Sequence, residues 1–369
     1  MRIGIDTNIL LLDKAGPAVY TQQLIRNLKA IDMVNEYVYF SYALQSRNNN
    51  LFAAKIGNAA LDYLWMPVIL PRKLKSNKVD VLHCPAFKAP LKCGIPLVVT
   101  FYDVHILKSP KDYKPWLAMY CKFMLKKISS AADKIVTISE FSKKDIIDTL
   151  SVPEDKVAVT YCGKSDKFQV IADGELKDSI RKKYGLNKKF ILYVGAVQPR
   201  KNIPTLLRAY SRLKKGAEFD YDLVFVSSSG WNNKDIFLFI NSLGIANDVK
   251  LLRNISEEDL TVIYNTADFF VYPSFFEGFG MPVLEAMSCG CPVICSNASS
   301  LPEVVGGAGL TFNPNDEGAL EGLMKDMAGN SALRQSLRNK GIERAKLFSW
   351  EKCARETLKI YNEVSLSRN

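Results

Sequence analysis

The amino-acid sequence predicts an α/β protein built from two parallel-sheet units, and three observations support this fold class. The chain has 369 residues, a length that suits two compact domains. Strand-like apolar segments alternate with amphipathic segments almost throughout, which is the pattern of a doubly wound parallel sheet. The segment Phe190–Ala196 is a nearly continuous apolar run, as expected for a strand covered by helices on both faces.

The first half of the chain opens with a predicted strand, a loop over Asp6–Pro17 and an amphipathic helix over Val19–Ala30. A later helix is expected to begin after Ser139, whose hydroxyl can accept a hydrogen bond from a free amide at the helix N-terminus. The strands predicted in this half are Arg2–Ile5, Tyr37–Ala43, Val79–His83, Leu97–Phe101, Lys134–Ile138 and Val157–Tyr161.

The second half continues the alternation after a polar and basic stretch, Gly163–Lys189, which we interpret as the connection between the domains. The strands predicted after Phe190–Ala196 are Leu223–Ser227, Val249–Leu252, Phe269–Pro273 and Pro292–Cys295. The helices predicted between them are Thr205–Lys215, Lys234–Leu243, Glu257–Asn265 and one that starts at Pro282. We expect one domain over residues 1–167, joined by a C-terminal helix at 350–369, and a second domain over residues 168–349.

The composition is that of a globular protein, with 48% apolar and 24% charged residues, and it excludes a disordered or collagen-like chain. No apolar run reaches the ~18 residues of a membrane-spanning helix. The first residues indicate a strand and not a signal peptide. The eight cysteines form no C-x-x-C pair, so we expect a reduced, cytoplasmic protein with buried thiols.

Positive charge is concentrated in the first half of the chain. Residues 1–167 carry 24 basic and 15 acidic side chains, a net +9, and the remainder carries 25 and 23, a net +2. A basic half favours an anionic partner such as a membrane surface. The lysines are scattered, without the arginine clusters and exposed aromatics of a nucleic-acid site, so no nucleic-acid partner is expected. Ordinary solvated surface lysine is the alternative.

Glu277 lies in a glycine-rich loop directly after a predicted strand. Gly278 and Gly280 would let the backbone approach a ligand closely, and Pro282 suits the first position of the helix that follows. The free amides and the positive end of that helix would then face the carboxyl edge of the sheet, where they can bind phosphate. Glu285 lies one turn into the same helix, where its carboxylate could bind the hydroxyls of a ribose.

Arg200 and Lys201 occupy a second loop between a strand end and a helix start. Because ligands bind at the carboxyl ends of the strands in such folds, we expect both cations in the same cleft. There they would neutralise a diphosphate. Carboxylates beside an anion site indicate a ligand with hydroxyls on both sides of its phosphates, such as a nucleotide sugar. Simple solvation of the basic pair is the alternative.

Three other patterns carry no predicted chemistry. Asp220–Asp222 has the D-x-D spacing of a metal site, but it precedes a strand and so lies at the wrong end of the sheet. The cysteines of Cys289–Cys295 have no histidine at zinc-ligand spacing, so no metal site is expected. Ser300–Glu303 is the pattern of a helix capping box.

Longer motifs resemble the retaining glycosyltransferases of family four, which have the GT-B fold. The motifs are PRKNIPTLL at 199–207, EGFGMPVLEAMSCGCPVI at 277–294 and SNASSLPEVVGGAGLTFNP at 296–314, with LHCPAF, VVTFYDV and ISEFSKKDI in the first half. The resemblance covers nearly the whole chain. It implies two facing Rossmann-like domains with a central cleft, of which the C-terminal one binds a nucleoside-diphosphate sugar and the N-terminal one the acceptor.

The resemblance also implies roles for individual residues. Arg200 and Lys201 would bind the diphosphate, Glu277 the sugar hydroxyls and Glu285 the ribose. Gly16 would approach the β-phosphate from the other domain, although the family commonly has a second glycine where this chain has Ala18. The other donor-binding candidates are Gly195, the pair Asn254 and Ile255 beside the base, and the backbone of Phe279, Gly280, Met281, Pro282 and Val283.

At the end of a first-half strand, Tyr102 replaces a histidine that many family members carry. A phenol can bond a sugar but is a poor base near pH 7. Asp103 is therefore the better candidate for orienting the acceptor hydroxyl, with capping of the following turn as the alternative. We expect His105 to be an ordinary surface residue and His83 to shape the cleft wall.

The resemblance implies a metal-independent hexosyltransferase that needs no cofactor beyond its donor. It would move mannose or glucose to a glycan or a lipid-linked acceptor, in the cytoplasm or at the inner face of the membrane. The helix-like segment Trp116–Lys127 could face an anionic membrane, or it could simply pack on its own domain. A nucleotide-sugar epimerase and a catalytically silent nucleotide-sugar-binding protein are the alternative functions.

Overall fold

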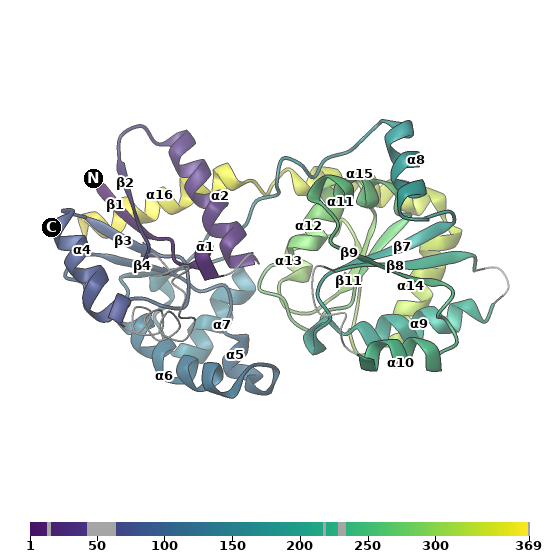
Figure 1. The fold of residues 1–369 in the computed structure, drawn as a ribbon, viewed down its shortest axis with the longest axis horizontal. Helices are drawn as coiled ribbons and strands as arrows, with labels where there is room; N and C mark the ends of the chain where they lie inside the picture. Colours follow the sequence, from purple (N-terminus) through teal and green to yellow (C-terminus); the bar gives the residue numbers. More distant parts are fainter. Residues whose placement is uncertain (13–15, 43–63, 217–218, 228–233, 368–369) are drawn as a thin grey trace, which may run out of the picture. The chain divides into compact units, whose positions relative to one another are not determined.

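A computed structural model describes residues 1–12, 16–42, 64–216, 219–227 and 234–367. The chain divides into two compact units: unit 1 comprises Met1–Gly163 with Trp350–Asn369, and unit 2 comprises Lys164–Ser349. Each unit contains a six-stranded parallel sheet, which confirms the predicted α/β class (Figure 1). Part of the predicted loop Asp6–Pro17, at 13–15, lies outside the described residues.

In unit 1 the strand order is β2-β1-β3-β4-β5-β6. The strands are β1 (Arg2–Asp6), β2 (Glu36–Phe40), β3 (Val81–Cys84), β4 (Leu97–Thr100), β5 (Lys134–Thr137) and β6 (Val157–Val159). The main helices are α2 (Gly16–Ile31), α4 (Leu70–Ser76), α6 (Pro115–Ala131), α7 (Glu140–Leu150) and α16 (Trp350–Leu366). As predicted, α7 follows Ser139, whose side chain accepts a hydrogen bond from the Ser142 amide at 3.0 Å.

The C-terminal helix α16 belongs to unit 1, where it packs against α2. The hydroxyl of Tyr361 on α16 lies 2.6 Å from Nδ1 of His83, and Nε2 of the same ring lies 2.8 Å from the Thr100 hydroxyl. His83 is fully buried, and burial lowers its pKa to about 3, so the ring is neutral. The expectation that His83 shapes a cleft wall is wrong, because the side chain joins α16 to the sheet.

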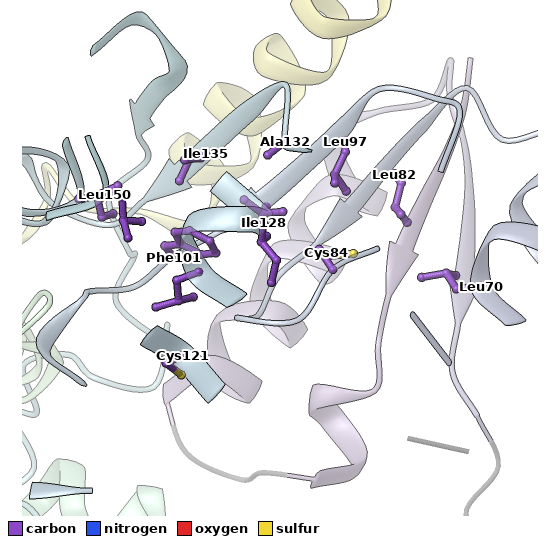
Figure 2. Close-up of a cluster of buried hydrophobic side chains, with 14 of the residues drawn as sticks. Leu70, Leu82, Cys84, Leu97, Phe101, Cys121, Ile128, Ala132, Ile135 and Leu150 are labelled. Carbon is purple, nitrogen blue, oxygen red and sulfur yellow. The ribbon is translucent and has the colours of Figure 1, made fainter. Parts of the chain in front are cut away.

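The core of unit 1 lies between its sheet and the covering helices (Figure 2). Leu82, Leu97 and Ile135 come from the strands, and α6 adds Cys121 and Ile128. All five side chains are at most 1% exposed. Burial of such side chains is the main source of stability of a sheet covered by helices, at about 1.5–3 kcal/mol for each large one.

In unit 2 the strand order is β12-β11-β10-β7-β8-β9. Read from β9, with β7 counted as strand 1 of the unit, this is the 3-2-1-4-5-6 order of a Rossmann fold. The strands are β7 (Lys189–Val194), β8 (Tyr221–Ser227), β9 (Val249–Arg253), β10 (Phe269–Tyr272), β11 (Val293–Ser296) and β12 (Leu310–Phe312). The helices are α8 (Gly174–Lys183), α9 (Ile203–Lys214), α10 (Lys234–Ser242), α11 (Glu257–Thr266), α12 (Met281–Ser288), α13 (Leu301–Val305), α14 (Glu317–Gly329) and α15 (Ser331–Ala345).

One segment differs from its prediction. The stretch Gly163–Lys189 contains the helix α8, which packs against α11 inside unit 2. Asp173 caps α8 by accepting a hydrogen bond from the Leu176 amide at 3.0 Å. Because α8 packs against α11, the segment is part of the second unit. Only Ile180 of this helix is buried, so its sequence has little of the apolar periodicity that predicts a helix.

Candidate active site

The loops that follow β7 and β10 form the candidate site in unit 2. These two strands are parallel neighbours, so their carboxyl ends lie at the same edge of the sheet. The strand order reverses between them, and ligands of open α/β sheets bind at this switch point. Arg200 and Lys201 lie in a short 3₁₀ turn after β7, and Glu277 lies in the loop after β10. A backbone hydrogen bond of 2.8 Å from Phe275 N to Arg200 O ties the two loops together.

The three predicted charged side chains meet directly. Lys201 Nζ lies 2.6 Å from Glu277 Oε1 and donates a second hydrogen bond of 2.6 Å to the Tyr272 hydroxyl. Arg200 Nη1 lies 3.1 Å from Glu277 Oε2 and 3.1 Å from the carbonyl oxygen of Phe276. Two cations share one carboxylate, so the formal charge of this cluster is +1. A cluster of this sign at a sheet's carboxyl edge favours an anionic ligand.

Glu277 is ionised in this cluster. Burial alone would raise the pKa of its carboxyl group, but the charges of Lys201 and Arg200 outweigh burial and lower the pKa to about 2. Lys201 and Glu277 are 7% and 6% exposed, so water screens their attraction only weakly. The carboxylate therefore stays charged at neutral pH and holds both cations beside the loop.

Two serines after β11 hold the Glu277 loop in place. The Ser299 hydroxyl accepts a hydrogen bond from the Glu277 amide at 2.9 Å. The fully buried Ser300 hydroxyl lies 2.9 Å and 2.8 Å from the carbonyl oxygens of Glu277 and Phe279. The predicted capping box at Ser300–Glu303 is wrong, because Ser300 makes no side-chain cap on α13 and its hydroxyl bonds this loop instead.

The helix α12 begins four residues after Glu277. Gly280 is its N-cap and has a φ of 109°, a conformation that residues with a Cβ rarely adopt. Met281 is the first helical residue, so Pro282 takes the second position and not the first as expected. Phe279 and Val283 are buried on either side of this turn. The first amides of α12 therefore follow directly on the charged loop.

Glu285 lies one turn into α12, as predicted, but its environment differs from that of Glu277. Its Oε2 atom accepts a hydrogen bond of 3.1 Å from the Tyr264 hydroxyl on α11. Burial raises the pKa of Glu285 to about 7. Of the two glutamates that flank the start of α12, Glu277 therefore has a pKa below the usual value and Glu285 has a pKa above it.

The other donor-binding candidates of unit 2 lie at the same edge of the sheet, and what distinguishes them there is their backbone conformation. Gly195 follows β7 with a φ of 155°, and a Cβ there would come within 3.0 Å of the Tyr193 hydroxyl. Asn254 and Ile255 follow β9, which β8 separates from β7. Asn254 is exposed and has a φ of 53°.

The remaining candidates belong to unit 1. Gly16 is the first residue of α2 and not part of a preceding loop, since the helix starts earlier than predicted. The Tyr102 hydroxyl donates a hydrogen bond of 2.8 Å to the carbonyl of Pro85. Asp103 Oδ1 accepts one of 3.0 Å from the His105 amide, which is the turn-capping alternative. His105 is 7% exposed and lies 3.4 Å from Asp112, so the expectation of a surface histidine is wrong.

The D-x-D pattern lies away from the site. Asp220 precedes β8 and pairs with Lys188 at 2.8 Å, while Asp222, near the start of β8, pairs with Lys250 at 3.3 Å. Both are at the amino end of the strand, opposite the edge that carries Glu277. In the part of the chain that the structure describes, no group of three or more His, Cys, Asp or Glu side chains is arranged to hold a metal ion.

Some residues of the site have no clear functional signal in the sequence. Tyr272 and Tyr264 place hydroxyls on Lys201 and Glu285, and Ser300 holds the loop between them. Both tyrosines lie within apolar segments that suggest only core packing. The adjacent Ser299 and Ser300 after a strand end are a signal for these contacts, but the pattern Ser300–Glu303 also predicts a capping box.

Comparison with known proteins identifies the family. Residues 177–344 match the model described as "Glycosyl transferases group 1", and residues 16–168 match "Glycosyltransferase Family 4". The chain is 34% identical over 288 residues to the O-antigen chain mannosyltransferase B of Escherichia coli, covering 78% of this chain and 75% of that protein. It is 28% identical to the serotype-specific mannosyltransferase WbdA of Escherichia coli over 70% of this chain, but it spans only 36% of that longer protein.

Solved structures show the same fold. A sucrose-phosphate synthase from Thermosynechococcus elongatus superposes with a TM-score of 0.75 at 20% identity, covering 100% of both chains. The Anabaena protein HepE in complex with UDP-glucose superposes with a TM-score of 0.75 at 16% identity, covering 98% of this chain and 100% of that one. The fold is GT-B. With its two parallel sheets and its Arg200–Lys201–Glu277 cluster, the chain belongs to the family 4 (group 1) glycosyltransferases and is a glycosyltransferase.

Proposed function

We propose that this glycosyltransferase moves mannose from a nucleoside-diphosphate donor to an acceptor hydroxyl, with retention of the anomeric configuration and without a metal ion, in polysaccharide biosynthesis. The observation that carries the proposal is the meeting of Arg200, Lys201 and Glu277 at the switch point of unit 2. Mannose is favoured over glucose because the similar E. coli proteins are named mannosyltransferases. The epimerase and the silent binding protein gain no support from these relatives.

In the proposed mechanism unit 2 stabilises the departing diphosphate. Arg200, Lys201 and the first amides of α12 supply positive charge where negative charge develops as the bond between the sugar and the phosphate breaks. The acceptor oxygen forms its bond to the same carbon on the same face. The acceptor proton passes to an oxygen of the departing diphosphate, so no separate base is required. Glu277 orients the sugar, and Glu285 binds the ribose.

On the acceptor side, the Asp103 carboxylate orients the attacking hydroxyl in addition to capping the turn, and Tyr102 contacts the sugar. Asp103 is half-buried next to the turn that starts at His105. The acceptor is a glycan, free or lipid-linked, that the enzyme meets at the inner face of the membrane. Among the described residues, no helix combines the length and the apolar character needed to cross a bilayer.

The test is product formation by the purified full chain. GDP-mannose, UDP-glucose and UDP are first screened for thermal stabilisation, since a bound ligand raises apparent stability by mass action. The stabilising sugar donor is then incubated with mannose-terminated oligosaccharides, and the product's anomeric configuration is read by NMR. We expect an α-linked product from an α-linked donor. Inversion at the anomeric carbon, or an isomerised nucleotide sugar without transfer, would contradict the proposal.

Glu277→Gln keeps the shape of the side chain and removes its charge, so this variant should lose at least a hundredfold in kcat, the scale of removing one transition-state interaction. Asp222→Asn is a matched control, because Asp222 is equally buried and also paired with a lysine but lies at the other end of the sheet. Transfer by the Glu277→Gln variant near the wild-type rate would refute the assignment.

A further inference from the structure

The helix α6 carries a stripe of exposed apolar side chains. Trp116, Met119 and Phe123 are 66%, 63% and 61% exposed. Their spacing of three and four residues places them on one face of the helix. The opposite face is buried in the core of unit 1, where Cys121 and Ile128 lie (Figure 2). The helix is therefore anchored by one face and presents three large apolar side chains to solvent on the other.

Lysines border this stripe. Lys122, Lys126 and Lys127 are exposed on the same helix, and its 17 residues include no aspartate or glutamate. An apolar face edged by basic residues is the composition of helices that lie in the interface of an anionic membrane. The first half of the chain, to which α6 belongs, also carries nearly all of the net positive charge.

An open pocket of about 400 Å³ adjoins the C-terminal half of α6. Lys126, Lys127 and Ser130 line it together with Ala131 and the half-exposed Leu91. The two ammonium groups suit the oxygens of a phosphate, and the apolar side chains beside them suit hydrocarbon. The Ser130 hydroxyl donates its hydrogen bond to the Lys126 carbonyl at 2.9 Å. The pocket and the stripe share one helix, so a single surface could bind both parts of a lipid.

We propose that the α6 surface, defined as Trp116, Met119, Phe123, Lys126 and Lys127, docks on an anionic phospholipid bilayer. The two aromatic rings and the methionine enter the interfacial region, and the lysines bind head-group phosphates. A nucleic acid would use the lysines but would leave the stripe exposed to water. The proposal rests on the proposed function and deepens it, because it names the surface of unit 1 through which the enzyme meets the membrane. That surface takes no part in the Arg200–Lys201–Glu277 cluster.

The test is sedimentation of the full chain with vesicles of phosphatidylcholine alone, or of an equal mixture of phosphatidylcholine and phosphatidylglycerol. The wild type should bind the mixed vesicles and not the neutral ones. The double variant Lys126→Glu/Lys127→Glu should bind at least thirty-fold more weakly, since each lysine near an anionic surface contributes a factor of about five and the reversal adds repulsion. The experiment is run in low-salt and in high-salt buffer. The triple variant Trp116→Ser/Met119→Ser/Phe123→Ser should lose most of its binding to the mixed vesicles in both buffers.

Matched controls lie in unit 2. Leu238 on α10 is 65% exposed, so Leu238→Ser removes an equally exposed apolar side chain away from α6. Lys325→Glu/Lys340→Glu makes the same charge change on exposed lysines. Both controls should bind like the wild type. Thermal stabilisation of every variant by the nucleotide donor reports that the chain is folded, and it separates failure of this proposal from failure of the proposed function.

The proposal is overturned if the wild type binds neither vesicle, or binds both equally, or if the α6 variants bind the mixed vesicles as tightly as the wild type. Analytical ultracentrifugation supplies the other decisive outcome. If the wild type forms an oligomer that the triple variant does not, while vesicle binding is unchanged, the stripe is a contact between copies of the chain and the membrane assignment is wrong.

Discussion

Replacing Lys201 by methionine tests the charge cluster of unit 2. Lys201→Met keeps most of the side-chain volume but removes the closer of the two cations that contact Glu277, and Arg200 remains at 3.1 Å. Glu277 has a pKa of about 2 in the folded chain against a usual value of 4.5. At ~1.4 kcal/mol for each unit of pKa, the difference between these two pKa values corresponds to roughly 3 kcal/mol in the free energy of unfolding. Arg200 retains part of it, so we expect a loss of about 2 kcal/mol at pH 7.

The sign of the pH dependence follows from the lowered pKa. A carboxyl group whose pKa is lower in the folded chain stabilises it above the unfolded value of 4.5, and this contribution is lost as the pH falls toward 2. The difference between the wild type and Lys201→Met should therefore be full at pH 7 and smaller at about pH 3. Urea unfolding followed by circular dichroism at both pH values measures it.

The control for this experiment is Lys188→Met. Lys188 pairs with Asp220 at 2.8 Å, but the two side chains are 48% and 71% exposed, so water screens the pair and its removal should have no measurable effect. Equal stability of Lys201→Met and wild type at pH 7 would refute the reasoning. A loss that is the same at both pH values would also refute it, because the effect would then come from packing and not from charge.

Three further predictions concern the same loops. Burial raises the pKa of Glu285 to about 7, so ionisation of this carboxyl group costs stability as the pH rises above 4.5. Glu285→Gln should therefore raise the free energy of unfolding by up to about 3 kcal/mol at pH 8 and leave it unchanged near pH 4. Equal effects at the two pH values would contradict this prediction. In Ser300→Ala the carbonyls of the Glu277 loop lose a buried hydrogen-bond donor, so the free energy of unfolding in urea should fall by about 1–3 kcal/mol. The variant should lower kcat more than the affinity for the nucleotide sugar, and Ser300→Thr should partly restore both. Gly280→Ala should lower the thermal unfolding temperature more than Gly244→Ala does. Both glycines have a positive φ, but a Cβ at 280 would lie 2.6 Å from Leu301, whereas a Cβ at 244 would meet no atom within 4 Å. Equal losses would show that the clash with Leu301 is relieved.

The charged part of the site could be predicted because it depends on local order along the chain. Arg200, Lys201 and Glu277 each follow an apolar strand by a few residues, and the ends of parallel strands share an edge of the sheet. The same reasoning placed the Asp220–Asp222 pattern at the opposite edge. A strand's end is visible in a sequence because polar and glycine residues replace the apolar run there.

The hydroxyl partners could not be predicted, because they depend on which strands are neighbours and which way a side chain points. Tyr272 reaches Lys201 from the last residue of β10, and Tyr264 reaches Glu285 from α11. In the sequence both tyrosines are simply part of apolar runs. Helix α8 is hard to predict for a related reason, since a helix with one buried residue lacks apolar periodicity and its N-cap, Asp173, is the main signal left.

The most direct test of the central claim is calorimetric titration of the full chain with UDP and GDP, each compared with its monophosphate. If Arg200 and Lys201 bind the terminal phosphate of a nucleoside diphosphate, the wild type should bind the preferred diphosphate at least tenfold more tightly than the monophosphate, and Lys201→Met should abolish most of that ratio. A ratio near one in the wild type, or an unchanged ratio in the variant, would contradict the account.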